Sequence, residues 1–163
     1  MECDIAPIAE HHIEGFRAAL DTVAKERRYL AFFEAPPLES ATAFVLGNIQ
    51  KDYPQFVALV QDQVVGWCDI IPSTKPAERH TGTLGMGLLP GWRGKGIGRR
   101  LMQATIDKAR DLNLTRIELT VRENNDNAIV LYKSMGFETE GLKRKAHRNG
   151  DAYENILMMA LLF

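Results

Sequence analysis

The chain has 163 residues, and its 20 basic and 21 acidic side chains give a formal net charge of −1. This length suits one domain, residues 1–163, and the balanced charge argues against a nucleic-acid partner. No apolar run approaches the ~20 residues that cross a bilayer, and no signal sequence opens the chain. We therefore expect a soluble cytoplasmic protein without a membrane partner. The two cysteines and four histidines lack ligand spacing, so no metal site is expected.

Hydrophobic periodicity and turn residues predict the element order β-α-α-β-β-β-α-β-α-β-β. The predicted elements are strands at 3–8, 55–60, 64–71, 80–89, 117–121, 138–147 and 152–162, and helices at 10–27, after Ser40, at 97–112 and after 124–127. In the helix that Ser40 is predicted to cap, Phe44, Val45 and Ile49 are expected to face inward. The dipeptide Asn149-Gly150 predicts a type I′ hairpin between the last two strands.

A glycine-rich segment, Arg93–Gly98, lies between a predicted strand and a predicted helix and reads RGKGIG. Its backbone amides and the positive end of the helix dipole face one point, which is a site for a phosphate or pyrophosphate. It is not a P-loop, because Gly96 rather than Ser or Thr follows Lys95. A dinucleotide fingerprint also fails, because Arg99 and Leu101 stand where the third glycine is required.

A second motif, Asn125–Phe137, reads NDNAIVLYKSMGF. Its asparagines can cap a helix, Gly136 ends that helix, and Phe137 opens a strand. The patterns R-x-x-G-x-G and N-x-x-A-x-x-L-Y-x-x-x-G-F, in this order and separated by one helix and one strand, resemble the signature motifs of the GNAT N-acetyltransferase superfamily. The resemblance covers essentially the whole chain and implies the GNAT fold, an α/β (α+β) domain with a mixed central sheet flanked by helices.

The resemblance implies acetyl-CoA as cosubstrate. The strand before the glycine loop should splay from its neighbour, so that its backbone can pair with the pantetheine arm. Tyr132 falls where the family carries the acid that protonates the departing thiolate, a role that suits a phenol with a reference pKa of ~10. The implied cofactor-binding residues are Met86, Leu88, Arg93, Gly94, Lys95, Gly96, Gly98, Arg99 and Asn125.

The resemblance places an acceptor pocket between the loop joining the first two helices, the middle strands and the C-terminal hairpin. The predicted substrate-binding residues are Phe33, Glu34 and Asp69, with Tyr29, Phe32, Trp67, His147 and Tyr153 as further wall residues. The strand before the glycine loop holds no carboxylate where many relatives carry one. His80, Asp69, Glu34 and Glu118 are all candidates for the general base, and the sequence does not choose among them.

The resulting prediction is a transferase that moves an acetyl group from acetyl-CoA to the primary amine of a small molecule by direct attack in a ternary complex. The free amino acids and their analogues are the expected acceptors, because the chain looks most like the phosphinothricin-acetyltransferase branch. Two alternatives stay open: a protein N-terminal or lysine acetyltransferase, and a non-catalytic acyl-CoA-binding or regulatory module. Dimers are common in the superfamily, and a homodimer is an open alternative for this chain.

Overall fold

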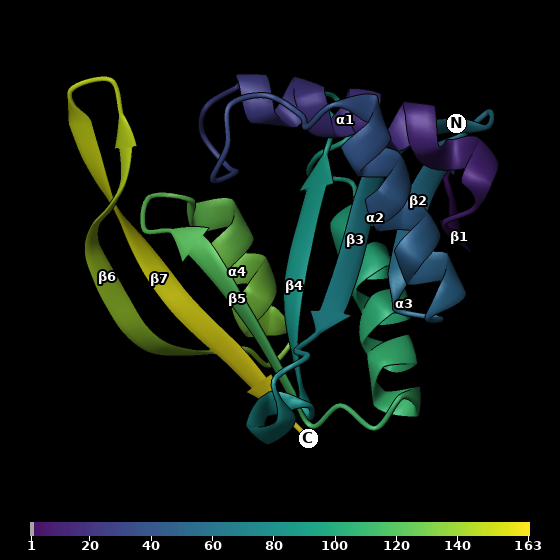
Figure 1. The fold of residues 1–163 in the computed structure, drawn as a ribbon. Helices are drawn as coiled ribbons and strands as arrows, with labels where there is room; N and C mark the ends of the chain where they lie inside the picture. The colour runs from purple at the N-terminus through teal and green to yellow at the C-terminus, as the bar shows by residue number, and fades with distance from the viewer. Residues whose placement is uncertain (1) are drawn as a thin grey trace.

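A computed structural model describes residues 2–163 and shows one seven-stranded sheet of order β1-β2-β3-β4-β5-β7-β6 (Figure 1). Only the β4–β5 pair is parallel, and the other neighbours are antiparallel. The strands are β1 Asp4–Pro7, β2 Gln55–Val60, β3 Gln63–Pro72, β4 Thr81–Leu88, β5 Arg116–Arg122, β6 Glu138–Asn149 and β7 Ala152–Leu162. The helices are α1 Ile13–Lys25, α2 Leu38–Gln50, α3 Ile97–Asp111 and α4 Asp126–Ser134, with short 3-10 turns η1 Glu10–His12 and η2 Pro76–Glu78. The predicted element order and mixed sheet are confirmed.

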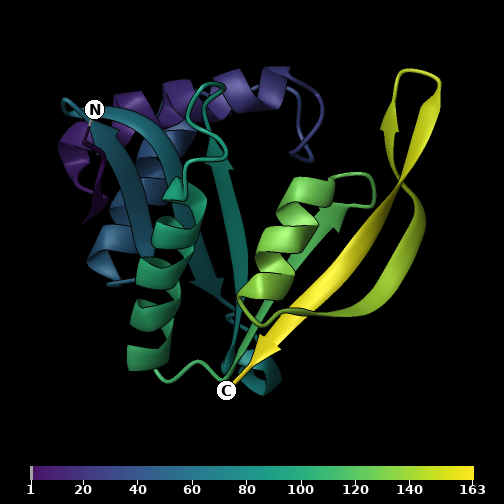
Figure 2. The same ribbon diagram turned by 180° about the vertical axis from the view of Figure 1, so that it is seen from behind.

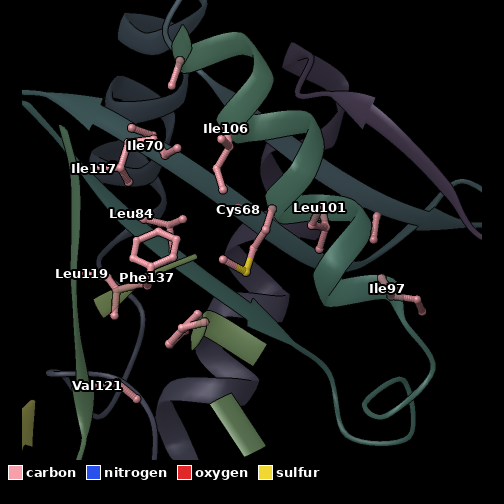
Figure 3. Close-up of a cluster of buried hydrophobic side chains, with 14 of the residues drawn as sticks. Cys68, Ile70, Leu84, Ile97, Leu101, Ile106, Ile117, Leu119, Val121 and Phe137 are labelled. Carbon is pink, nitrogen blue, oxygen red and sulfur yellow. The ribbon is translucent and has the colours of Figure 1, made fainter. Parts of the chain in front are cut away.

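Helices cover both faces of the sheet: α1 and α2 lie on one face, and α3 and α4 lie on the other (Figures 1 and 2). The core under α1 and α2 includes Phe16 and Trp67, whose rings meet edge to face at 5.9 Å. The core under α3 and α4 gathers Cys68, Leu101 and Phe137 (Figure 3). Successive strand residues point to opposite faces, so β3 sends Trp67 into one core and Cys68 into the other.

The two predictions for α2 that concern its cap and its inward face are wrong. The N-cap is Pro37, so Ser40 lies inside the helix. Phe44 and Ile49 are 40% and 42% exposed, and only Val45 of the expected trio is buried. The buried stripe instead runs through Ala41, Val45 and Asn48, and the buried Asn48 amide donates a hydrogen bond of 2.9 Å to Gln55.

The hairpin between β6 and β7 is present, but its turn is not type I′. Asn149 pairs with Ala152, so Gly150 and Asp151 form the loop. Gly150 alone has a positive φ, at 64°. Since type I′ needs positive φ at both central residues, a glycine at the first position only fits type II′.

Strands β4 and β5 pair at one end only, which opens a wedge in the middle of the sheet. Their pairing stops at Thr83 and Glu118, while β4 continues to Leu88 and β5 continues to Arg122 (Figure 1). The predicted splay of this strand is therefore confirmed. Within residues 2–163, no helix is long and apolar enough to span a membrane.

Candidate active site

The wedge between β4 and β5 opens into a cavity of about 610 Å³. Its wall is formed by the end of α1 with the loop after it, β4, the glycine loop with the start of α3, β5, α4 and the β6–β7 hairpin. Among the lining residues are Tyr29, Leu30, Gly85, Met86, Leu88, Arg93, Gly94, Gly96, Gly98, Arg99, Thr120, Arg122, Asn125, Tyr132 and His147. Nine of the ten cofactor-site and acid residues predicted from the sequence thus share one cavity with Tyr29 and His147, and Lys95 is the exception.

The glycine loop owes its shape to backbone conformation rather than to crowding. Gly94 and Gly96 have φ values of 73° and 80°, and a Cβ at either position would meet nothing within 4 Å. Gly96 is the N-cap of the 15-residue helix α3, and no side chain caps this end. The first amides of α3 and its dipole therefore face the cavity, where a phosphate group can satisfy them.

The opened edge of β4 offers further backbone groups to a ligand. The Leu89 N–H bonds to Val65 of β3, so the alternation of a strand turns the backbone groups of Met86 and Leu88 toward β5. No β5 residue pairs with them, because pairing ends at Thr83. The Leu88 carbonyl accepts from Arg93 Nε at 3.0 Å, which leaves the Leu88 N–H facing the wedge. An extended amide-bearing chain would find strand-like partners here.

The structure gives the charged residues of the loop distinct surroundings. Arg93 pairs with Glu26 at 2.6 Å, and its guanidinium lies 4.6 Å from the Tyr29 ring centroid. Glu26 also raises the pKa of the Arg93 guanidinium above its usual value. Arg93 therefore ties the end of α1 to the end of β4. Arg99 binds Ser134 of α4 at 2.5 Å, and the Lys95 ammonium lies 5.8 Å from the Trp92 ring centroid without lining the cavity.

Helix α4 places Tyr132 at the cavity wall. Asn125 caps this helix, because its Oδ1 accepts from the Ala128 N–H at 3.3 Å. Tyr132 is buried, with its ring 6.0 Å from that of Phe137. Burial raises the pKa of the Tyr132 phenol above its usual value, and the charge of Cys68 adds to the effect. The phenol consequently holds its proton at neutral pH.

Arg122 is a wall residue that sequence reasoning missed. It is 3% exposed, pairs with Glu154 of β7 at 2.8 Å, and donates to the carbonyls of Arg27 and Leu30 at 2.8 and 2.9 Å. These bonds fasten the loop after α1 to β5 and β7. Its sequence, an arginine ending an alternating strand, is that of any surface strand end, so no local signal marks it.

The residues predicted for the acceptor pocket do not all gather there. Tyr29 and His147 line the cavity, but Phe33 and Glu34 do not. Phe33 stacks beneath the Arg27 guanidinium at 3.9 Å, and Glu34 is exposed. The other three predicted wall residues also lie outside the cavity lining. Trp67 is buried in the core under α1, and Phe32 and Tyr153 are exposed.

Asp69, the third predicted substrate-binding residue, lies on β3 opposite Gly85. Its side chain is 9% exposed, and burial alone raises the pKa of its carboxyl to about 7. Within residues 2–163 no hydrogen bond or ion pair reaches this carboxylate, and no three His, Cys, Asp or Glu residues are grouped to hold a metal ion.

Comparison with known proteins defines the class. The model of the acetyltransferase (GNAT) family matches residues 13–137. The L-amino acid N-acetyltransferase AaaT of Escherichia coli is 38% identical over 104 residues, which are 61% of this chain and 64% of that protein. The N-alpha-acetyltransferase RimI of Mycobacterium tuberculosis is 39% identical over 94 residues, 55% of this chain and 56% of that protein. The matched segments thus span less than two thirds of both relatives.

The fold has close structural counterparts. A GNAT phosphinothricin acetyltransferase from Sinorhizobium meliloti, solved in complex with acetyl-CoA, superposes with a TM-score of 0.93 at 18% identity and covers 100% of this chain and 89% of that one. At this identity the likeness establishes the fold alone. With more than half of the chain matched by the family model, this protein belongs to the GNAT acetyltransferase family.

Proposed function

We propose that this protein transfers the acetyl group of acetyl-CoA to the primary amine of a small molecule, with a free amino acid or an analogue as the acceptor. The observation that carries the proposal is the wedge between β4 and β5. It joins an anion-binding glycine loop, an unpaired strand edge and a buried phenol in one cavity of about 610 Å³.

The residues of the cavity fit acetyl-CoA along its length. Backbone amides from Gly94 to Arg99 would hold the pyrophosphate at the start of α3. The backbone groups of Met86 and Leu88 would pair with the amides of the pantetheine arm. The cosubstrate supplies the activated acetyl thioester. The separation of β4 from β5 leaves these backbone groups free to bind it.

The proposed mechanism is direct transfer in a ternary complex. The cavity holds both reactants together, which removes much of the entropic cost of their encounter. Backbone amides near Leu88 polarise the thioester carbonyl and stabilise the oxygen charge that develops there. Tyr132 gives its proton to the departing sulfur. Both cysteines are buried outside the cavity lining, so neither is placed to carry the acetyl group.

A small acceptor is favoured by the way the cavity is walled. Arg27, in the loop after α1, forms two hydrogen bonds with Asn149 of the hairpin, at 3.1 and 3.0 Å. Arg122 of β5 also donates a hydrogen bond to the Arg27 carbonyl. These contacts cross the acceptor end, where a peptide would need an open groove. The residues lining the cavity include no Asp or Glu, so the wall offers no carboxylate to a polycationic peptide.

The test is release of free coenzyme A thiol from acetyl-CoA across a panel of amines: free amino acids, glufosinate-like analogues, polyamines, aminoglycosides and basic peptides. A blank without amine corrects for hydrolysis, and an enzyme-only blank corrects for protein thiols. Release that depends on a free amino acid or analogue supports the proposal. Release with peptides alone would assign the protein to N-terminal or lysine acetylation. Tight acetyl-CoA binding without release across the panel would favour a binding module.

A further inference from the structure

Strand β4 carries no carboxylate, and the structure offers one on the neighbouring strand. Asp69 of β3 is the register partner of Gly85, two residues beyond the last paired residue of β4. It therefore stands beside the narrow end of the wedge. We propose that the Asp69 carboxylate is the base that takes the proton from the acceptor's ammonium group, an inference that rests on the proposed function.

Asp69 is not itself a lining residue, and Gly85 is the lining residue next to its carboxylate. Gly85 is exposed and lines the cavity, and a Cβ built on it would lie 3.5 Å from Asp69 Oδ1. A side chain at position 85 would pack against the carboxylate, whereas glycine leaves that space open. The neighbouring glycines have another explanation: a Cβ at Gly82 would strike Ile70 at 2.5 Å, and one at Gly87 would strike Trp67 at 2.4 Å. Packing thus accounts for those two, and Gly85 alone opens a path.

The environment suits a base that works near neutral pH. Burial is the sole cause of the raised pKa of Asp69, about 7, since no charge contributes. The same face carries uncharged Gln55 and Asn48 from β2 and α2, and the buried side of α1 is apolar. On that face of β5, the ionisable groups are Arg116, Glu118 and Arg122. Arg116 pairs with Glu118 and Glu140, and Arg122 pairs with Glu154.

Gln55 places a hydrogen-bond donor beside the Asp69 carboxylate. It is the register partner of Asp69 on β2, and its Oε1 is occupied by Asn48 Nδ2 at 2.9 Å. Its Nε2 is buried and has no partner. An unpaired donor next to an unpaired carboxylate gives a water molecule two partners, so the proton can also pass through one water.

The other three candidate bases are less suitable. His80 is exposed and precedes β4, at the end of the strand opposite the glycine loop. Glu118 is engaged by Arg116 at 3.1 Å, and Glu34 is exposed and outside the cavity lining. Asp69 shares the sheet face of Trp67, two residues earlier on β3, whereas Tyr132 belongs to the core on the other face. Base and acid therefore lie on opposite faces of the sheet.

Asp69 takes one proton from the acceptor's ammonium and later releases it to solvent, which leaves a neutral amine to attack the thioester carbon. The new C–N bond forms as the C–S bond breaks, and the sulfur takes the Tyr132 proton. The nitrogen, now an amide, returns its extra proton to Tyr132. One proton is released per turnover, and no oxidant or metal is required.

The experiment compares Asp69→Asn with Asp62→Asn, the same change at an exposed turn carboxylate. Turnover is measured from pH 5.5 to 9 with the best amine of the panel, and acetyl-CoA affinity is measured by calorimetry. We expect Asp69→Asn to lower kcat/KM about 100-fold at pH 7 and to abolish the limb that rises through pH about 7 in the wild type. Its acetyl-CoA affinity and the whole profile of Asp62→Asn should match the wild type.

A second acceptor separates proton removal from a structural role. Hydroxylamine is unprotonated at neutral pH and needs no base, so the deficit of Asp69→Asn should shrink to a few-fold with it. An unchanged acidic limb in Asp69→Asn, or an equal deficit with both nucleophiles, overturns the assignment of Asp69 while the transferase stands. A wild-type protein that binds acetyl-CoA and acetylates no amine overturns the proposed function and this inference together.

Discussion

The cavity has two halves, one proposed to bind the cosubstrate and one proposed to bind the acceptor, and they present different kinds of groups to a ligand. The half proposed for the cosubstrate is made mainly of backbone: glycines at φ 73° and 80°, the amides at the start of α3, and the unpaired edge of β4. The half proposed for the acceptor is made of side chains from distant segments, such as Arg122, His147 and Tyr29. Backbone features impose a local pattern on the sequence, whereas a wall assembled from distant side chains imposes none.

The largest expected effect comes at the junction of the two halves. Tyr132→Phe removes the proton donor but keeps the buried ring, so kcat should fall about 1000-fold while acetyl-CoA affinity is unchanged. Steady-state turnover with calorimetry on the same preparations measures both. Tyr53→Phe, outside the cavity lining, is the matched control and should behave as the wild type. Unaltered turnover in Tyr132→Phe would mean that the sulfur leaves without help from this phenol.

In the acceptor half, removing one charge should lower the stability of the fold. Arg122→Met leaves Glu154 without its cation and frees the carbonyls of Arg27 and Leu30, so stability should fall by about 3 kcal/mol. Urea unfolding measures this loss. The double variant Arg122→Met/Glu154→Gln should recover part of it, because no charge is then left unpaired. Equal losses in the single and double variants would show that the loop contacts, and not the ion pair, stabilise this wall.

The sequence predicts the backbone half well because its determinants are local. Periodicity gives the bounds of β2 and β7 as the structure has them, and the glycine spacing locates the start of α3. The acceptor half depends on contacts such as that between Arg122 and the Arg27 carbonyl, 95 residues apart in the chain. Trp67 shows the same limit, since it was predicted to line the pocket. An aromatic residue on a middle strand can line a pocket or fill a core, and the contact with Phe16 places Trp67 in the core.

The backbone half makes a charge-specific prediction at Gly96. Gly96→Asp should weaken acetyl-CoA binding about 50-fold, because a carboxylate at the N-cap of α3 would face the pyrophosphate. Gly96→Asn is the control, since asparagine has the same shape and tolerates the left-handed φ of 80° without the charge. It should weaken binding only a few-fold in the same calorimetric titration. Equal affinities for the two variants would remove the glycine loop from the phosphate site.

The smallest expected effect is on the free energy of unfolding, and it concerns Asp69. A carboxyl whose pKa rises from 3.8 in the unfolded chain to about 7 in the folded one binds its proton more tightly when folded. Its stabilising contribution is complete below pH 4 and is lost as the pH rises to about 7. The difference in unfolding free energy between the wild type and Asp69→Asn should therefore shift by about 2 kcal/mol between pH 5 and pH 8, in favour of the variant at high pH.

Urea unfolding at both pH values measures this shift, with Asp62→Asn as the reference for a carboxylate that stays in solvent. The sign matters more than the size, because an ion-paired carboxylate would make the wild type relatively more stable as the pH rises. A relative gain by the wild type at pH 8 would mean that a cation reaches Asp69 in solution. Such a partner would hold the carboxylate ionised and weaken it as a base, so the same titration also tests whether the side-chain half of the cavity supplies the proton acceptor.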